Sequence, residues 1–545
     1  MHVVQDEDSL YKGHPRRGSW STTSLTTIRS ILRNLLLTLR SGRRMNSSNF
    51  LLGLLLVGTF LTYLNVTKLN AVISRLTSNN EYATGGLSNG HGPVRTFAIH
   101  GKRVDSGYLA HVFEAFERFG YTRVNDTDGH WDVLWSHDYP FRVLNDQLTK
   151  LKPSQKVNHF PGSGYITNKM NLATSDLAYV PKAFQIPKDK DKLMKYAKDN
   201  LHKKFVQKSN NHRGIKIEKL EKLDLSKNGT FIQEYIGNPL LINGHKFDIG
   251  VYTVLTSINP LRIYIHRDVL FRFCIEQYHP FDPDVVEKYV VGDDYLPLWK
   301  VPDLERYYND LGLGMKDSFD AWYASKGKSP ESVWAQVESA IRTIYLSKEK
   351  QLIESTKRFP PGNGRNFFEM VRFDFVIDDE GKVYIMEANM SPNLSSAHFP
   401  PNRLLYEQVL FNILGLVGVG TNVAAGRSIE DTAQVASKQI AVFPKECFSE
   451  KCLHDCKSAP CNLCQNCLNE ETTEILKAGF LEFVNRGECF RVFPPSNRYK
   501  HIADSSNIRI SKETLDNYDI SDLSKVNQLQ VQWFRGKCNM DPAFC

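Results

Sequence analysis

Residues 368–396 read FEMVRFDFVIDDEGKVYIMEANMSPNLSS, and this stretch is the clearest indication of the fold. Apolar residues alternate with others over 373–377, an acidic turn ending in glycine follows at 378–381, and a second apolar run covers 383–386. Two such runs joined by a short glycine-containing turn are typical of a β-hairpin. The stretch therefore predicts two antiparallel strands that lie side by side.

Three polar residues make this hairpin a candidate metal site. Asp374 lies near the start of the first strand, and Glu387 and Asn389 lie near the end of the second. Because side chains alternate along a strand, Glu387 and Asn389 project to the same face. Their oxygen atoms suit a hard cation such as Mg2+ that holds triphosphate oxygens. A hairpin that only ends in polar residues is the alternative, since acidic turns are common.

Three segments upstream extend the pattern. They read NHFPGS at 158–163, KSNNHRG at 208–214 and FIQEYIGNPLLINGHKFD at 231–248. Together with the hairpin they resemble the tubulin-tyrosine-ligase-like family, over residues 131–416. The resemblance implies an α/β (α+β) chain with an ATP-grasp fold, in which two sheets clamp ATP. It also implies an activity that attaches amino acids, usually glutamate, glycine or tyrosine, through ATP and Mg2+.

The resemblance assigns nucleotide contacts to residues scattered along the chain. Two lysines match family lysines that contact ATP, and an Arg-Gly pair matches a loop that covers the phosphates. Four consecutive residues fall where the family's hinge lines adenine, and the K-F-D motif supplies a further pair. A surface lysine is the alternative for Lys169 and Lys208, and an ordinary buried strand is the alternative for the hinge residues. The expected nucleotide-binding residues are Lys169, Lys208, Arg213, Gly214, Gln233, Glu234, Tyr235, Ile236, Lys246 and Asp248.

Several positions depart from the family pattern. Lys216 replaces the second glycine of the phosphate loop, and VVGDDY at 290–295 replaces the family's HLTNYS. The family's K-F-D-I-R ends here in Gly250, where the missing arginine would lie near the reacting phosphate and be worth about a thousandfold in rate. Arg267 matches a later arginine that faces the amino-acid substrate, with Arg272 behind it, and a structural salt bridge is the alternative for either. The catalytic residues expected from the resemblance are Arg267 and Lys246.

Two functions are compatible with these motifs. The first is an ATP-dependent ligase that adds free glutamate to a glutamate side chain of tubulin or another acidic protein. The resemblance then implies that Asp374, Glu387 and Asn389 hold Mg2+ between the phosphates. The second is a catalytically weakened, ATP-binding pseudoenzyme that acts as a membrane-anchored scaffold or a binding protein of the secretory pathway. Gly250 and Lys216 favour this alternative.

Composition is that of a folded protein. The chain has 545 residues, of which 41% are hydrophobic and 23% charged, so a mainly disordered protein is excluded. The net charge of +8 is spread along the sequence. No nucleic-acid partner is expected from such a distribution, whereas an acidic protein substrate is compatible with it.

An uncharged run at 50–66 predicts a single-pass signal anchor at 47–67. Four arginines precede the run, against Lys68 and Arg75 after it, so the N-terminus is expected in the cytosol and the body in the lumen or outside the cell. The reverse orientation, or a run that does not span, remains open. A lumenal body would require a lumenal acidic protein rather than a tubulin tail as acceptor.

Ten cysteines are distributed unevenly, because all except Cys274 follow Pro444. Such a cluster in an oxidising compartment favours disulfides of undetermined connectivity. Zinc is the alternative, since three cysteines at 461–467 have ligand-like spacing. The expected domains are a cytosolic basic tail (1–46), a transmembrane anchor (47–67), a flexible stem (68–93), a small α/β domain (94–187), the ATP-grasp domain (188–440) and a cysteine-rich module (441–545).

Overall fold

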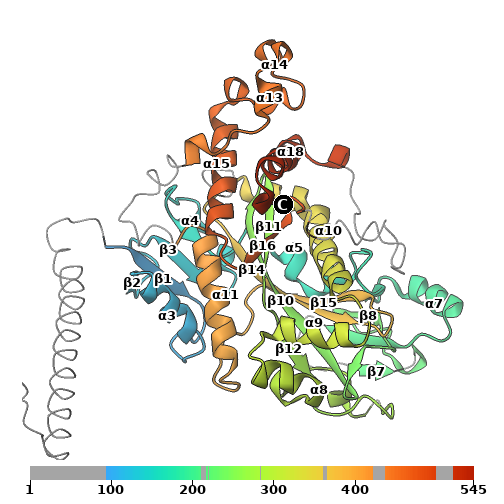
Figure 1. Cartoon of the computed structure of the whole chain (residues 1–545). Coiled ribbons are helices and arrows are strands. Elements are labelled where there is room, and N and C mark those ends of the chain that lie inside the picture. Colours follow the sequence, from blue (N-terminus) through green and yellow to red (C-terminus); the bar gives the residue numbers. More distant parts are fainter. Residues whose placement is uncertain are drawn as a thin grey trace, which may run out of the picture. The chain divides into compact units, whose positions relative to one another are not determined.

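A computed structural model describes residues 94–209, 216–218, 220–282, 284–359, 365–420, 436–496, 498 and 520–545. These residues belong to one compact unit, Pro93–Cys545. Three sheets and the helices around them build this unit (Figure 1). The mixed α/β fold expected from the sequence is therefore confirmed.

The first sheet is small and parallel, with the order β2-β1-β3-β4. Helix α3 lays its apolar side on it, because its buried residues recur at helical spacing and Phe116 stacks on Phe97 of the sheet at 4.5 Å between ring centroids. The elements are β1 (Thr96–His100), α3 (Ala110–Arg118), β2 (Thr122–Val124), β3 (Val133–Ser136), α4 (Asn145–Leu148), β4 (Lys156–Val157), α5 (Gly164–Thr167) and α6 (Lys169–Ala173).

The second sheet is antiparallel and has the order β5-β8-β6-β7. Its apolar side is covered by α7, whose Leu193 is fully buried in a cluster with Phe184, Phe205 and Ile232. The opposite side carries Lys208 and Gln233 toward the candidate site described below. The elements are β5 (Ala183–Ile186), α7 (Lys190–Asp199), β6 (Phe205–Ser209), β7 (Lys216–Glu218) and β8 (Thr230–Glu234).

The central sheet has eight strands built around the long β10. Strand β10 pairs with β9, β11, β12 and β14, all antiparallel, and β15 follows β14. Helix α10 packs on β10, β15 and β16 (Figure 1). The elements are β9 (Leu241–Ile242), β10 (His245–Ile258), β11 (Leu261–His266), β12 (Leu270–Phe273), β13 (Leu296–Pro297), α8 (Pro302–Glu305), α9 (Met315–Ser325), α10 (Pro330–Thr356), β14 (Glu369–Ile377), β15 (Val383–Asn389) and α11 (Asn402–Leu416).

The predicted hairpin forms, as strands β14 and β15. Its acidic turn is closed by Asp378 N–H, which donates to the carbonyl of Lys382 at 3.0 Å. Gly381 provides a φ of +89°, a left-handed conformation that a side chain would strain. The register places Asp374 directly opposite Glu387.

The cysteine-rich segment is held by disulfides, as predicted, rather than by zinc. Four pairs form: Cys447–Cys464, Cys452–Cys461, Cys456–Cys467 and Cys538–Cys545. Cys274 and Cys489 are buried and unpaired. The segment also supplies β16, which pairs with β11, so it completes the central sheet. Its elements are α13 (Pro444–Cys447), α14 (Glu450–His454), α15 (Glu470–Asn485), β16 (Cys489–Phe493) and α18 (Lys525–Met540).

The prediction of a single-pass membrane protein with a lumenal or extracellular body is corrected. Across the residues that the structure describes, no helix combines the length and the apolar character needed to cross a bilayer. The expected anchor at 47–67, the tail at 1–46 and the stem at 68–93 lie outside the described residues. The remaining domain boundaries stay predictions.

Candidate functional site

One face of the central sheet gathers the polar residues of the hairpin and of the K-F-D motif. Every second residue of β10 lies on the same face of the sheet, and Lys246, Asp248 and Gly250 are three such residues. Asp248 lies opposite Arg272 of β12, and Gly250 lies opposite Asp374 of β14. Strands from distant parts of the chain thus present their charged groups side by side.

Two aspartates and two arginines form an alternating ionic cluster on this face. Arg272 donates to Asp248 through Nε at 2.9 Å and through its terminal nitrogen at 2.8 Å, and also to Asp374 at 3.0 Å. Arg372 donates to Asp374 through Nε at 2.7 Å and through its terminal nitrogen at 3.0 Å. Asp374 and Arg372 are only 4% and 6% exposed. Bidentate pairing of this kind satisfies buried charges that would otherwise be costly.

The pKa values of the two aspartates shift in opposite directions in this cluster. Burial raises the pKa of Asp248 to about 6, an effect that Arg272 opposes and the nearby Asp374 reinforces. Burial acts on Asp374 as well, but Arg372 and Arg272 outweigh it and hold the pKa of Asp374 below its usual value. Asp374 is therefore the fixed negative charge of the cluster.

Glu387 and Asn389 lie beside Asp374 and border a cavity of about 1610 Å³. Asn389 donates its amide N–H to Asp374 at 3.1 Å, so its amide oxygen stays available to another partner. Glu387 pairs with Lys169 at 3.0 Å, and Lys169 is the first residue of α6, which Asn168 caps by accepting from Asn171 N–H. Two carboxylates and an amide oxygen on one hairpin face fit a hard cation such as Mg2+.

The other predicted lysines approach the same region. Lys208 Nζ donates to Gln233 at 3.0 Å. Burial first, and then repulsion by Lys246 and Lys169, lowers the pKa of Lys208 to about 8, although Glu387 opposes the shift. Lys246 donates to the carbonyl of Tyr289 at 3.0 Å, and burial lowers its pKa also. Lys208 is thus close enough to Lys169 and Lys246, which lie on two other elements, for their charges to act on its pKa.

The side chains of the expected hinge residues point to opposite sides of the chain. Gln233 faces Lys208, and the Tyr235 ring lies under Lys246 Nζ at 4.9 Å. Glu234 points the other way, where it pairs with Lys203 at 2.7 Å. Ile236 is buried. Gln233 and Tyr235 are therefore the hinge side chains that face the candidate site.

Some predicted residues are not brought together with this site. Arg267 follows β11, is half-exposed and pairs with Asp317 of α9 at 3.1 Å. Arg272, which the sequence placed behind Arg267, is the arginine that lies in the ionic cluster. The register explains this, because Asp248 is opposite Arg272. Arg213 and Gly214 lie outside the described residues.

Arg372 is the site residue that the sequence analysis missed. It stands two positions before Asp374, and strand alternation alone places both on one face. Its contact with β10 could not be read from the sequence, because β10 and β14 are more than a hundred residues apart in the chain.

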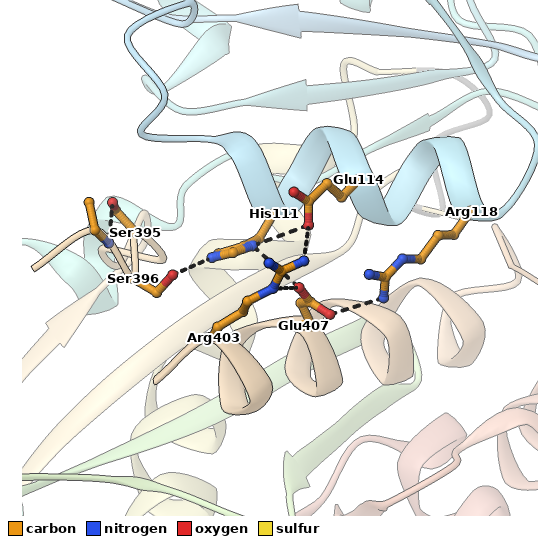
Figure 2. A network of polar contacts seen from close by, with 8 residues as sticks. His111, Glu114, Arg118, Ser395, Ser396, Arg403 and Glu407 are labelled. Atoms are coloured by element: carbon orange, nitrogen blue, oxygen red, sulfur yellow. Dashed lines mark hydrogen bonds and ion pairs between the residues drawn. The ribbon is translucent and has the colours of Figure 1, made fainter. Parts of the chain in front are cut away.

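A second polar network secures the chain that leaves the hairpin (Figure 2). The hydroxyl of Ser396 and His111 Nε2 of α3 lie 2.8 Å apart, and Glu407 of α11 pairs with Arg118 at 3.0 Å and with Arg403 at 2.5 Å. His111, Glu114 and Glu407 are close enough to bind a metal. The two arginines already balance Glu407, so this network fits a structural brace for the segment after Asn389.

Comparison with known proteins identifies the family of this chain. A model of the tubulin-tyrosine ligase family matches residues 147–425. The probable tubulin polyglutamylase ttll-15 of Caenorhabditis elegans is 41% identical over 460 residues, which are 81% of this chain and 84% of that protein. Tubulin polyglutamylase TTLL6 of Mus musculus is 25% identical over 57% of this chain and 39% of its own length. Tubulin monoglutamylase TTLL4 of Homo sapiens is 25% identical over 54% of this chain and 26% of its own length. The chain therefore belongs to the tubulin-tyrosine ligase family.

Proposed function

We propose that this chain is an ATP-dependent ligase that joins glutamate to a glutamate side chain of tubulin or of another acidic protein. The observation that carries the proposal is the convergence of Lys169 and Lys208 on Glu387, with Lys246 on the other side of Lys208 near enough to act on its charge. Several cations around a carboxylate that borders a cavity suit a polyphosphate bound together with a divalent ion.

Mg2+ would be held by Glu387 and Asn389, and by Asp374 through lone pairs that its bonds to Arg372 and Arg272 leave open. When bound, the ion neutralises charge between the β- and γ-phosphates and aligns them. Lys208 and Lys246 would hold phosphate oxygens, with Gln233 and Tyr235 beside the base. Asp248 would act through Arg272, since both of its oxygens are paired with that guanidinium.

The proposed reaction has two steps. The acceptor carboxylate attacks the γ-phosphorus of ATP, so that an acyl phosphate forms and ADP leaves. The amine of free glutamate then attacks the acyl carbon, phosphate leaves, and the amine loses a proton as the amide bond forms.

An acidic acceptor suits the rest of the cavity. Lys102, Arg142, Lys350 and Arg358 line it, against Asp138 and Glu354. This excess of basic groups would attract a glutamate-rich peptide. Tubulin is the first acceptor to test, because the relatives above are named for glutamylation of tubulin.

The test is incorporation of isotopically labelled glutamate into purified tubulin with ATP and Mg2+. Wild-type protein should label tubulin, and Glu387→Gln should abolish labelling while the protein stays folded. Glu305→Gln, an exposed change on α8, is the matched control and should label normally. Absence of ATP-dependent labelling by the wild-type protein would refute the proposal for this acceptor.

A second candidate, a nucleotide-binding pseudoenzyme, is favoured by Gly250. It predicts that the wild-type protein binds Mg2+ and ATP but transfers glutamate to no acidic protein. Measuring nucleotide binding by calorimetry in parallel with labelling separates the two functions. Binding without transfer to any acidic acceptor would favour the second.

A further inference from the structure

The side chain of Arg372 fills the space that a side chain at residue 250 would need. A Cβ atom built on residue 250 would lie 2.8 Å from Cδ of Arg372, 3.2 Å from its Nε and 3.3 Å from its Cγ. Real Cβ atoms essentially never come closer than 3.0 Å to other heavy atoms. Gly250 lies within a regular strand, outside the left-handed region, so its backbone does not require glycine. With Arg372 in this position, a side chain at residue 250 would force the Arg372 side chain to shift.

The guanidinium of Arg372 ends in the ionic cluster. It donates hydrogen bonds to both oxygens of Asp374, which also accepts hydrogen bonds from Arg272 and Asn389. Buried arginines are retained only where their charge is matched. The cluster thus contains two guanidinium groups, one from β12 and one from β14, whereas β10 carries glycine at 250, where the family pattern described above has arginine.

We propose that Arg372, on the neighbouring strand β14, takes the place of the arginine that β10 lacks and positions Asp374 for the metal-bound nucleotide. This inference rests on the proposed function. Gly250 and Arg372 are then two parts of one change relative to the family pattern. The arginine side chain comes from β14 instead of β10, and glycine at 250 leaves space for it. Arg372 is a positioning residue, because its contact is with Asp374. Gly250 by itself therefore does not indicate a lost catalytic cation.

This change predicts a specific pattern among three variants. Gly250→Arg alone forces two arginine side chains into one space and should lower the melting temperature. Arg372→Gly alone should stay folded but bind Mg2+ with a non-hydrolysable ATP analogue about tenfold or more weakly, the scale of losing charge-assisted hydrogen bonds. The double variant Gly250→Arg/Arg372→Gly should recover both properties, which is non-additivity of the kind a double-mutant cycle detects.

A matched control separates this role from the loss of any buried ion pair. Arg262 of β11 is equally buried and pairs with Glu482 of α15 at 2.8 Å, apart from the ionic cluster. Arg262→Gly should lower the melting temperature without changing the Mg2+ dependence of analogue binding. For active preparations, Arg372→Gly should lower kcat and raise the Mg2+ concentration needed for half-maximal rate.

The deciding measurement is analogue affinity at several Mg2+ concentrations for the wild type and the variants, together with melting temperatures. This inference would be overturned, with the proposed function left standing, by unchanged or tighter Mg2+-dependent binding in Arg372→Gly. A double variant with no higher affinity and no higher melting temperature than the single variants would overturn it as well. A wild-type protein that binds no nucleotide would overturn both the proposed function and this inference. Weak binding in Arg372→Gly that the double variant restores would support it.

Discussion

Lys208 should make nucleotide binding depend on pH between 7 and 9. Its pKa is lowered from 10.5 to about 8, chiefly by burial. A lysine with this pKa is about 90% charged at pH 7 and about 10% charged at pH 9. Since the charged form attracts phosphate, affinity for Mg2+ and ATP should fall about tenfold over this range, which corresponds to about 1.4 kcal/mol.

Lys208→Arg provides the comparison, because a guanidinium stays charged throughout this range. The affinity of the variant should change little with pH if Lys208 causes the dependence. Lys246, whose pKa is also lowered by burial, is unchanged in both proteins, so the difference between the two profiles reports Lys208. Calorimetric titration with a non-hydrolysable ATP analogue at pH 7, 8 and 9 measures both profiles. A flat wild-type profile, or equal slopes in the two proteins, would show that the charge of Lys208 does not control nucleotide affinity.

Two further predictions concern stability. Burial raises the pKa of Glu338 in α10 to about 7, so the stability it contributes is complete below pH 4.5 and is lost as pH rises through about 7. Glu338→Gln should remove this loss, which is at most about 3 kcal/mol, and chemical denaturation at pH 5 and pH 8 would show it; an equal pH dependence in both proteins would contradict it. Gly381→Ala should cost about 1–2 kcal/mol because of the left-handed φ at the hairpin turn, whereas Gly129→Ala, with open space and ordinary φ, should cost less than half of that.

The hairpin could be predicted from sequence because its determinants are local. Alternation over 373–377 and a glycine-containing acidic turn specify two adjacent strands, and the same alternation places Glu387 and Asn389 together. The lysines required the resemblance to a known family, since an isolated lysine carries no positional signal. Lys169, Lys208 and Lys246 were found in this way, and the structure brings them near one another.

The remainder of the site depends on strand pairing that no local pattern encodes. Arg267 and Arg272 are indistinguishable by sequence spacing, and only the register of β12 on β10 selects Arg272. The relation of Gly250 to Arg372 requires β10 and β14 to be neighbours. Disulfide pairing is of the same kind, because the cysteine spacing after Pro444 allows many connectivities and the fold selects one set.

The lysines and the hairpin acids together are proposed to use ATP to join glutamate to an acidic protein. Mass spectrometry of tubulin after incubation with the protein, glutamate, Mg2+ and ATP detects this reaction directly. We expect added glutamate on tubulin tail peptides that requires ATP and disappears with Glu387→Gln. Tubulin that gains glutamate equally with the wild type and with Glu387→Gln, or gains none with the wild type, would contradict it.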